Sequence, residues 1–114
     1  MSSGEKDAIT ARLNVGLAEL DEAHASSGHS RAPVALDQQS VGRVSRVDAL
    51  QMQAMAQAQE RRRRGERGRI EAALERLESG EYGYCSECGE EIGLKRLEFD
   101  PAVATCIRCA GRGD

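Results

Sequence analysis

Hydrophobic residues recur at helical spacing near the start of the chain. The stripe consists of Ile9, Leu13, Gly16 and Leu20, thickened by Leu17. Steps of four, three and four residues are typical of a seam that packs against a second helix. Ser2 and Glu5 have the spacing of a capping box, and Ser26-Ser27-Gly28 breaks the helical pattern. The sequence therefore predicts a first helix that ends around Ala25.

A longer helical pattern runs from about Val41 to Glu78. Its first apolar stripe consists of Val44, Val47, Leu50 or Gln51, Ala54 or Met55, and Ala58, and its second of Ile70, Leu74 and Leu77. Gly65 and Gly68 lie between the stripes and each cost about 1 kcal/mol relative to Ala in a helix interior, so we expect a bend or weak point there. Met52 and Met55 are interpreted as packing residues.

The two predicted helices differ in length. At 1.5 Å per residue they would measure about 30 Å and about 57 Å, which predicts an unequal antiparallel hairpin. Residues 26–40, with Pro33, form the connection, which exceeds the usual length of about 2–8 residues for such loops. Ser79-Gly80 ends the second helix. We expect a mainly α fold, with a coiled-coil-like hairpin over residues 1–78 and a small domain over residues 79–114.

The composition favours exposed helices over a large enclosed core. The chain has one Phe, two Tyr and no Trp, and 31% of its residues are charged. Its net charge of −3 is unevenly spread: residues 60–78 hold seven basic and five acidic side chains, while residues 79–114 hold four basic and seven acidic ones. Only the middle segment could therefore offer phosphates a basic face. The arginines between Arg61 and Arg69 form either a solvated helix face or a contact surface.

The sequence predicts neither a signal peptide nor a membrane-spanning segment. The N-terminus lacks a positive region followed by an apolar core, and no apolar run approaches the length of a membrane span. We expect a cytoplasmic protein, in which thiols stay reduced and paired cysteines act as metal ligands. His24 and His29 flank the break in the helical pattern and are interpreted as solvated.

Four cysteines form two Cys-x2-Cys pairs separated by seventeen residues. They are Cys85, Cys88, Cys106 and Cys109. Two intervening residues let one tight turn direct both sulfurs at one ion, and Gly89 can take the positive φ that closes such a turn. Disulfides are disfavoured in a cytoplasmic chain, and a redox pair is disfavoured because no alternating strand–helix pattern surrounds the cysteines. The spacing of the pairs favours Zn²⁺ over an iron–sulfur cluster. Four thiolates leave no open position for a substrate, so the predicted zinc is structural.

The segment from Gly80 to Ile92, together with Arg96-Leu97-Glu98, Asp100-Pro101 and Cys106-Ile107-Arg108-Cys109, closely resembles the DksA/TraR zinc-finger family. Residues 36–51 look like the hairpin-tip region of its shorter DksA-like members. The two stretches cover about half of the chain. The first helix is too short for the full coiled coil of the longer members, and their Asp-x-x-Asp-x-Ala tip pattern is absent in that form.

The resemblance implies a bacterial transcription factor that binds RNA polymerase rather than DNA. Family members insert a coiled-coil tip through the secondary channel of the polymerase, often together with the alarmone ppGpp of the stringent response. By the same resemblance, Asp48-Ala49 is the nearest match to the family's tip and Asp37 is a second candidate. A contact with the polymerase rim or with ppGpp phosphates is one interpretation of Arg61, Arg62, Arg63 and Arg64.

Other interpretations of these residues stay open. Asp48 also fits the third position of a capping box that begins at Ser45, and Asp37 fits a helix cap or a loop residue. Seventeen residues between the cysteine pairs also suit a GATA-type DNA-binding finger, although residues 79–114 are acidic. The unequal helices favour, as a third hypothesis, an adaptor or dimerising helical protein. An enzyme is not expected, because we find no nucleophile–base pair, phosphate loop or open metal site.

Overall fold

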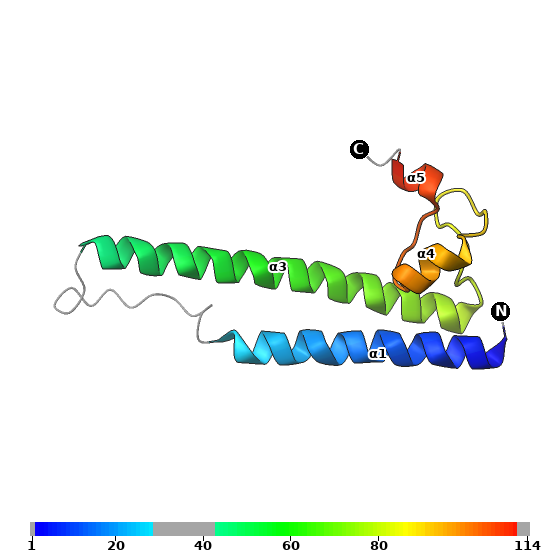
Figure 1. Cartoon of the computed structure of the whole chain (residues 1–114), viewed down its shortest axis with the longest axis horizontal. Helices are drawn as coiled ribbons and strands as arrows, with labels where there is room; N and C mark the ends of the chain where they lie inside the picture. The colour runs from blue at the N-terminus through cyan, green and yellow to red at the C-terminus, as the bar shows by residue number, and fades with distance from the viewer. Residues whose placement is uncertain (1, 29–42, 112–114) are drawn as a thin grey trace.

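The protein is a long helical hairpin with a small zinc-finger-like segment packed beside one end (Figure 1). Its computed structural model describes residues 2–28 and 43–111. The helices are α1 (Ser3–Ser26), α3 (Arg43–Ser79), α4 (Leu94–Phe99) and α5 (Ile107–Gly111). The molecule measures 63 × 31 × 20 Å, and α1 and α3 lie antiparallel along its long axis. The mainly α fold expected from the sequence is confirmed.

Helix α1 begins where the capping pattern predicts. The side-chain oxygen of Ser2 accepts a hydrogen bond from the backbone N–H of Glu5 at 3.2 Å, which satisfies one of the donors left free at a helix start. The helix ends at Ser26, one residue beyond the predicted end, and the N–H of Ser27 then bonds to the carbonyl of Ala23 at 3.1 Å.

The predicted seam joins α1 to α3. Among the residues that the structure describes, Leu13 is the largest fully buried side chain, with 2% of its surface exposed, and it shares a core cluster with Ile70 and Ala73 of α3. Partly buried side chains extend the seam on both helices: Ile9, Leu17, Leu20, Leu74 and Leu77. Gly16 lets the helices approach closely, because a methyl group there would lie 3.1 Å from Cδ1 of Ile70. The helical period therefore identified both faces of this interface.

Helix α3 projects well beyond α1. Its 37 residues span about 55 Å, whereas the 24 residues of α1 span about 36 Å. The end of α1 lies beside Glu60 and Arg63, so residues 43–59 of α3 continue without it; we call this part the overhang. Met52 and Met55 are 70% and 63% exposed, so their assignment as packing residues was wrong. The reason is that α1 ends before it reaches them.

Neither interior glycine of α3 interrupts the helix. Gly65 and Gly68 both lie within a continuous α-helix, and a methyl group at either position would meet no atom within 4 Å. The weak point expected there does not break the chain's longest element. Seam contacts on the opposite face, such as those of Ile70, hold the helix against α1 on the C-terminal side of the glycines.

A glycine ends α3 and redirects the chain. Gly80 has φ 82°, and the N–H of Glu81 bonds to the carbonyl of Arg76 at 2.9 Å, which is the pattern of a Schellman motif. The segment that follows packs back against the base of the hairpin. Its buried side chains join the same core cluster as Leu13 and Ile70: Tyr82, Cys85, Ile92, Leu97, Ala102, Val103, Cys106 and Cys109. One core therefore crosses the predicted boundary at residue 79.

Three arginines of the hairpin add polar contacts across this junction. Arg12 donates to the carbonyl of Glu98 at 3.0 Å and Arg76 to the carbonyl of Val103 at 3.4 Å. Arg69 pairs with the carboxylate of Asp100 at 2.5 Å. These contacts fix the base of the hairpin to the segment that carries the cysteines.

Across residues 2–28 and 43–111, no helix is both long enough and apolar enough to cross a membrane.

Candidate functional site

The first cysteine pair lies on a tight turn that a glycine closes. Cys85 and Cys88 lie in the turn between Tyr84 and Glu91, which form an isolated antiparallel bridge. The N–H of Cys85 bonds to the carbonyl of Glu90 at 2.7 Å, and the N–H of Gly89 bonds back to the carbonyl of Cys85 at 2.9 Å. Gly89 has φ 78°, the left-handed conformation predicted from the sequence. The turn directs both sulfurs to the same side.

The second pair lies at the start of α5. The N–H of Ala110 bonds to the carbonyl of Cys106 at 2.9 Å and so closes the turn that holds Cys106 and Cys109. The N–H of Ser86 bonds to the carbonyl of Ala104 at 2.9 Å, which joins the two turns directly. Arg96 of α4 donates to the carbonyl of Thr105 at 2.9 Å and positions the residue before Cys106.

The four sulfurs converge on one point. All of them lie within 4.8 Å of one another, and Sγ of Cys88 and Sγ of Cys106 are 3.7 Å apart. Four sulfurs placed 2.3 Å from a central Zn²⁺ would be separated by about 3.8 Å, so this distance fits a tetrahedral site. None of the four forms a disulfide, and only Cys88 is exposed. The arrangement fits one structural zinc, as the spacing predicts.

Backbone donors favour the thiolate form of these cysteines. Hydrogen bonds from backbone N–H groups, that of Cys106 foremost, outweigh the effect of burial and lower the pKa of the Cys85 thiol to about 6. One such donor is the N–H of Glu87, 3.4 Å from the sulfur of Cys85. The pKa of Cys106 is also lowered, chiefly by the backbone N–H of Cys109. Because zinc binds thiolates, these donors prepare the site for the metal.

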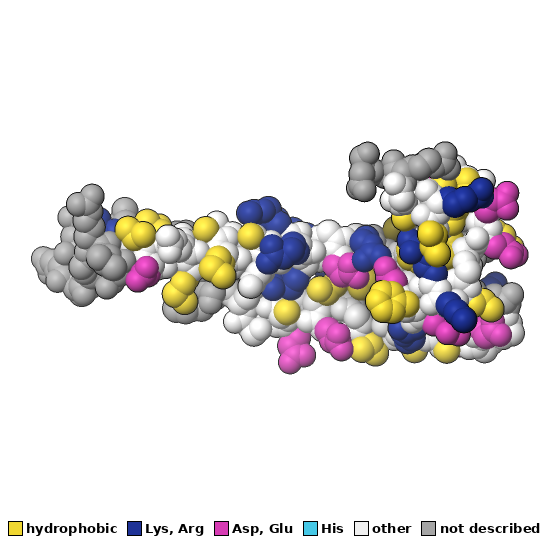
Figure 2. Space-filling model, turned by 45° about the horizontal axis from the view of Figure 1, so that its top comes forward, with side chains coloured by type: hydrophobic (Ala, Val, Ile, Leu, Met, Phe, Trp, Pro, Cys, Tyr) yellow, Lys and Arg dark blue, Asp and Glu magenta, His cyan; other side chains and the backbone are white. Residues whose placement is uncertain are grey.

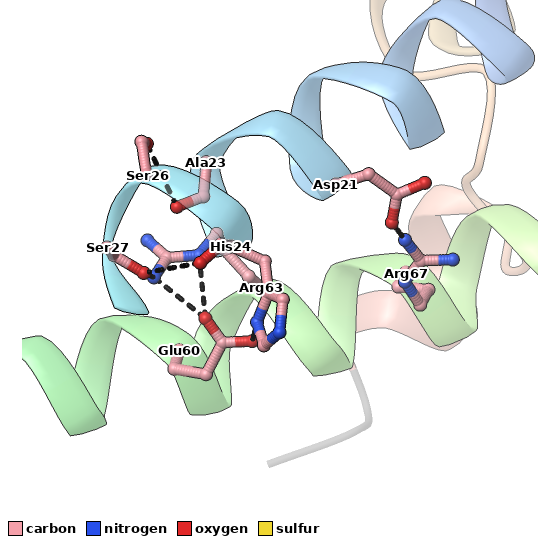
Figure 3. Close-up of polar contacts among 8 residues, drawn as sticks. All are labelled: Asp21, Ala23, His24, Ser26, Ser27, Glu60, Arg63 and Arg67. Carbon is pink, nitrogen blue, oxygen red and sulfur yellow. Dashed lines mark hydrogen bonds and ion pairs between the residues drawn. The ribbon is translucent and has the colours of Figure 1, made fainter. Parts of the chain in front are cut away.

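A second polar cluster joins the end of α1 to α3 (Figure 3). Glu60, which is only 5% exposed, lies 2.5 Å from Nδ1 of His24 and accepts two hydrogen bonds from Arg63, at 3.1 and 2.8 Å. Arg63 also donates to the hydroxyl of Ser27 at 2.9 Å. Burial acts to raise the pKa of Glu60, but the hydrogen bonds from Arg63 and His24 outweigh it and hold that pKa below the ordinary value. The sequence-based interpretation of His24 as a solvated residue therefore missed its contact with Glu60.

One neighbouring ion pair completes this cluster. Arg67 of α3 pairs with Asp21 of α1, one turn before the Glu60 contacts (Figure 3). Sequence reasoning missed these contacts because their partners lie far apart in the chain. The available signal was the four-residue step from Arg63 to Arg67, which places both side chains on one helical face.

The structure separates the predicted basic patch. Arg63 faces α1 and is bound to Glu60, whereas Arg61, Arg62 and Arg64 are exposed and make no ion pair among the residues that the structure describes. Figure 2 shows basic side chains gathered over the middle of the rod. Only three of the four predicted arginines are therefore available to a partner on this surface.

The predicted tip residues lie on the overhang or outside the described residues. Asp48 is exposed, and Ala49 beside it is half-buried. Because α3 already begins at Arg43, Ser45 lies inside the helix and cannot cap it, so the capping interpretation of Asp48 was wrong. Asp37 and His29 fall outside the described residues, as does most of the predicted connection.

The zinc segment is similar to a known protein family. The family model of the prokaryotic dksA/traR C4-type zinc finger matches residues 80–112. Residues 80–112 therefore form a C4 zinc-finger segment of the DksA/TraR type. The matched residues include both cysteine turns and α4, so the DksA/TraR similarity covers the elements that form the metal site.

Curated DksA proteins are similar over the same part of the chain. The RNA polymerase-binding transcription factor DksA of Haemophilus influenzae is 51% identical over 41 residues, which are 36% of this chain and 28% of that protein. DksA of Escherichia coli K12 is 46% identical over 41 residues, 36% of this chain and 27% of that protein. DksA of Caulobacter vibrioides is 48% identical over 44 residues. The similarity thus spans less than a third of each relative.

The likeness in fold extends further. The structure of transcription factor DksA2 from Pseudomonas aeruginosa superposes with a TM-score of 0.68 and covers 94% of this chain and 78% of that one. Sequence identity in this superposition is 24%. The hairpin and the zinc segment together therefore have a DksA-type fold, including the part of the chain where sequence similarity is low.

Proposed function

We propose that this protein is a non-enzymatic transcription regulator that binds bacterial RNA polymerase and acts through the secondary channel. The observation that carries the proposal is the DksA-type arrangement of a zinc-bearing base and a projecting helix over 94% of the chain. Relatives that share the zinc segment are named RNA polymerase-binding transcription factors. The four-cysteine site offers a metal no open position, so the zinc supports the fold rather than a reaction.

The overhang suits entry into a narrow channel. Residues 49–59 carry no charged side chain, so few charges must be desolvated when a partner surrounds them. Asp48, with Ala49 beside it, is the acidic group that we assign to the tip. A carboxylate there could meet a basic lining or metal-bound water inside the channel.

The exposed arginines of α3 form a positively charged surface next to the overhang. We assign Arg61, Arg62 and Arg64 to contacts with acidic groups of the polymerase or with ppGpp at the shared interface, which would connect the protein to the stringent response. Residues 79–114 hold seven acidic and four basic side chains, so sequence-specific DNA binding by the zinc segment is not expected. A partner of this kind places the protein in the cytoplasm.

Binding to purified core polymerase tests the proposal. Protein labelled at its N-terminus should bind in the micromolar range or tighter by fluorescence anisotropy, and the unlabelled protein should compete. An absence of binding at these concentrations would count against the function itself.

Transcription assays test the tip assignment separately. On a ribosomal promoter, Asp48→Asn should reduce the effect of the protein while leaving polymerase binding nearly unchanged, with and without ppGpp. Glu75→Gln, an exposed acid on the covered half of α3, is the matched control and should behave as the parent. If Asp48→Asn also behaves as the parent and Asp37→Asn does not, Asp37 is the tip residue. If neither changes the effect, the tip lies elsewhere although the function stands.

The exposed apolar side chains of the overhang favour one second candidate, a dimerising adaptor. Val47 and Leu50 are 48% and 44% exposed there, and another chain could cover them. Light scattering distinguishes the two functions, because a monomer at high concentration excludes the adaptor and leaves polymerase binding intact.

A further inference from the structure

A groove runs along the zinc end of the molecule, between the first turns of α1 and α4. One part encloses about 340 Å³ and is lined by Glu5, Ala8, Ile9, Arg12, Leu94, Leu97 and Glu98. A second part of about 580 Å³ continues past the zinc turn and is lined also by Tyr84, Glu91 and Ile92. Glu5, Leu94 and Leu97 belong to both parts, so the two recesses adjoin.

The floor of this groove is apolar and reachable from solvent. Leu97 is part of the core, but Leu94, one turn earlier on α4, is 66% exposed. Tyr84, which lines the second part together with Leu94, is 48% exposed. Single exposed leucines are ordinary on protein surfaces. Leu94 differs because it stands between two adjoining recesses, where a partner's side chains could fit on either side of it.

The rim of the groove is acidic. Glu5, Glu91 and Glu98 are exposed along it. Lys6 and Arg12 are the two basic residues of the lining, and Arg12 keeps its charge while it donates to the carbonyl of Glu98, so the lining carries one net negative charge. Four thiolates around one Zn²⁺ would add two further negative charges at this end. The surface therefore complements apolar side chains that are flanked by positive ones, and it disfavours the phosphates of a nucleic acid.

We propose that this groove binds a short amphipathic helix of a partner protein, with apolar side chains on either side of Leu94 and lysines or arginines facing the glutamates. The groove lies at the start of α1, whereas Asp48 lies near the start of α3, and these are opposite ends of the hairpin (Figure 1), so this inference is independent of the proposed function. A second copy of the chain fits less well. Its exposed arginine cluster, Arg61, Arg62 and Arg64, lies on α3, and contact of that cluster with this groove would be head-to-tail, which produces rings or filaments rather than a closed pair.

Peptide selection identifies the ligand class without naming the partner. Random twelve-residue peptides displayed on phage are selected against the full-length, zinc-loaded protein, biotinylated at its C-terminus. We expect enrichment of apolar residues at helical spacing with neighbouring Lys or Arg. The enriched peptide is then synthesised with a fluorescent label, and its Kd is measured by anisotropy.

Two matched pairs of variants locate the binding. Leu94→Ser should weaken the peptide about tenfold, because it removes the apolar contact at the centre of the groove. Phe99→Ser removes a side chain of the same helix that is 90% exposed but does not line the groove, and should leave Kd unchanged. Glu5→Gln should weaken binding about twofold at low salt and not at high salt, whereas Glu75→Gln should have no effect.

Other results would overturn the proposal. Enrichment of acidic peptides, no enrichment, or an affinity that Leu94→Ser does not change would each refute a basic amphipathic ligand in this groove. Sedimentation without peptide adds one more outcome: self-association that Leu94→Ser abolishes would make the groove an interface between copies of the chain. Leu94 and Glu5 are exposed, so far-UV circular dichroism and zinc content should stay unchanged in both variants.

Discussion

Replacement of Leu13 by alanine should destabilise both ends of the core. Leu13 is 2% exposed and contributes to a cluster that contains Ile70 and Ala73 of α3 as well as buried residues of the zinc segment. Leucine-to-alanine changes at such sites cost about 2–5 kcal/mol, through lost burial and the cavity that remains. A domain of this size has a total stability of about 5–15 kcal/mol. The change should therefore remove a large fraction of the free energy of unfolding.

Urea denaturation of the zinc-loaded protein measures this cost. Far-UV circular dichroism follows the helices, and near-UV circular dichroism follows the buried Tyr82. Leu50→Ala is the matched control, because Leu50 is 44% exposed on the overhang, and it should shift the free energy of unfolding by no more than about 0.5 kcal/mol. A cost below about 1 kcal/mol for Leu13→Ala would refute the close packing of the seam.

Zinc retention tests whether the core is shared. If Leu13 supports the zinc segment, Leu13→Ala should lose its metal at a lower concentration of a competing chelator than the parent, since metal binding and folding are linked. An unchanged chelator midpoint together with a large loss of helix stability would show that the two parts fold separately. The single core described above would then be wrong.

Three further changes test other parts of the structure. Removal of zinc from the parent with a chelator should abolish the near-UV signal of Tyr82 but leave a substantial far-UV helical signal, and an unchanged near-UV signal would contradict a structural role for the metal. Because folding lowers the pKa of Glu60, its ionised carboxylate should stabilise the fold at pH values above 4.5, the ordinary pKa of the group. This stability should be lost as the pH falls through the lower pKa of the folded state. Glu60→Gln should therefore be less stable than the parent at pH 7 and approach it in acid; comparing the two at each pH cancels the loss of zinc, and a constant difference would refute the assignment. Gly65→Ala should raise the free energy of unfolding by up to about 1 kcal/mol, whereas Gly16→Ala should gain less than half of that, because its methyl group would crowd Ile70; equal gains would refute the close approach at Gly16.

Sequence patterns predicted the local features of this protein well. The two residues between paired cysteines and the glycine after Cys88 define a turn whose geometry depends on few neighbours, so the metal site followed from spacing alone. The period of Leu13 and Ile70 likewise identified the buried faces of the hairpin. In both cases, interactions within a few residues or along one helical face carry the necessary information.

Contacts that depend on register between the helices could not be predicted. The bond between His24 and Glu60 joins residues 36 positions apart, and it requires knowing where α1 ends along α3. The same missing information led to Met52 and Met55 being assigned to packing. The arginine cluster in the sequence also does not reveal which of its members face α1. In the structure, Arg63 and Arg67 do so.

The difference in length between α1 and α3 implies a gradient of local stability along the rod. Near Ile70 the helix is held by the seam, whereas among residues 46–59 Ala56 is the one buried side chain. Amide hydrogens should therefore exchange with solvent faster at each successive turn from Glu60 back toward Arg43. A partner that encloses residues 43–59 would slow that exchange. Its binding would also cost less conformational entropy, because this part of the helix is already formed.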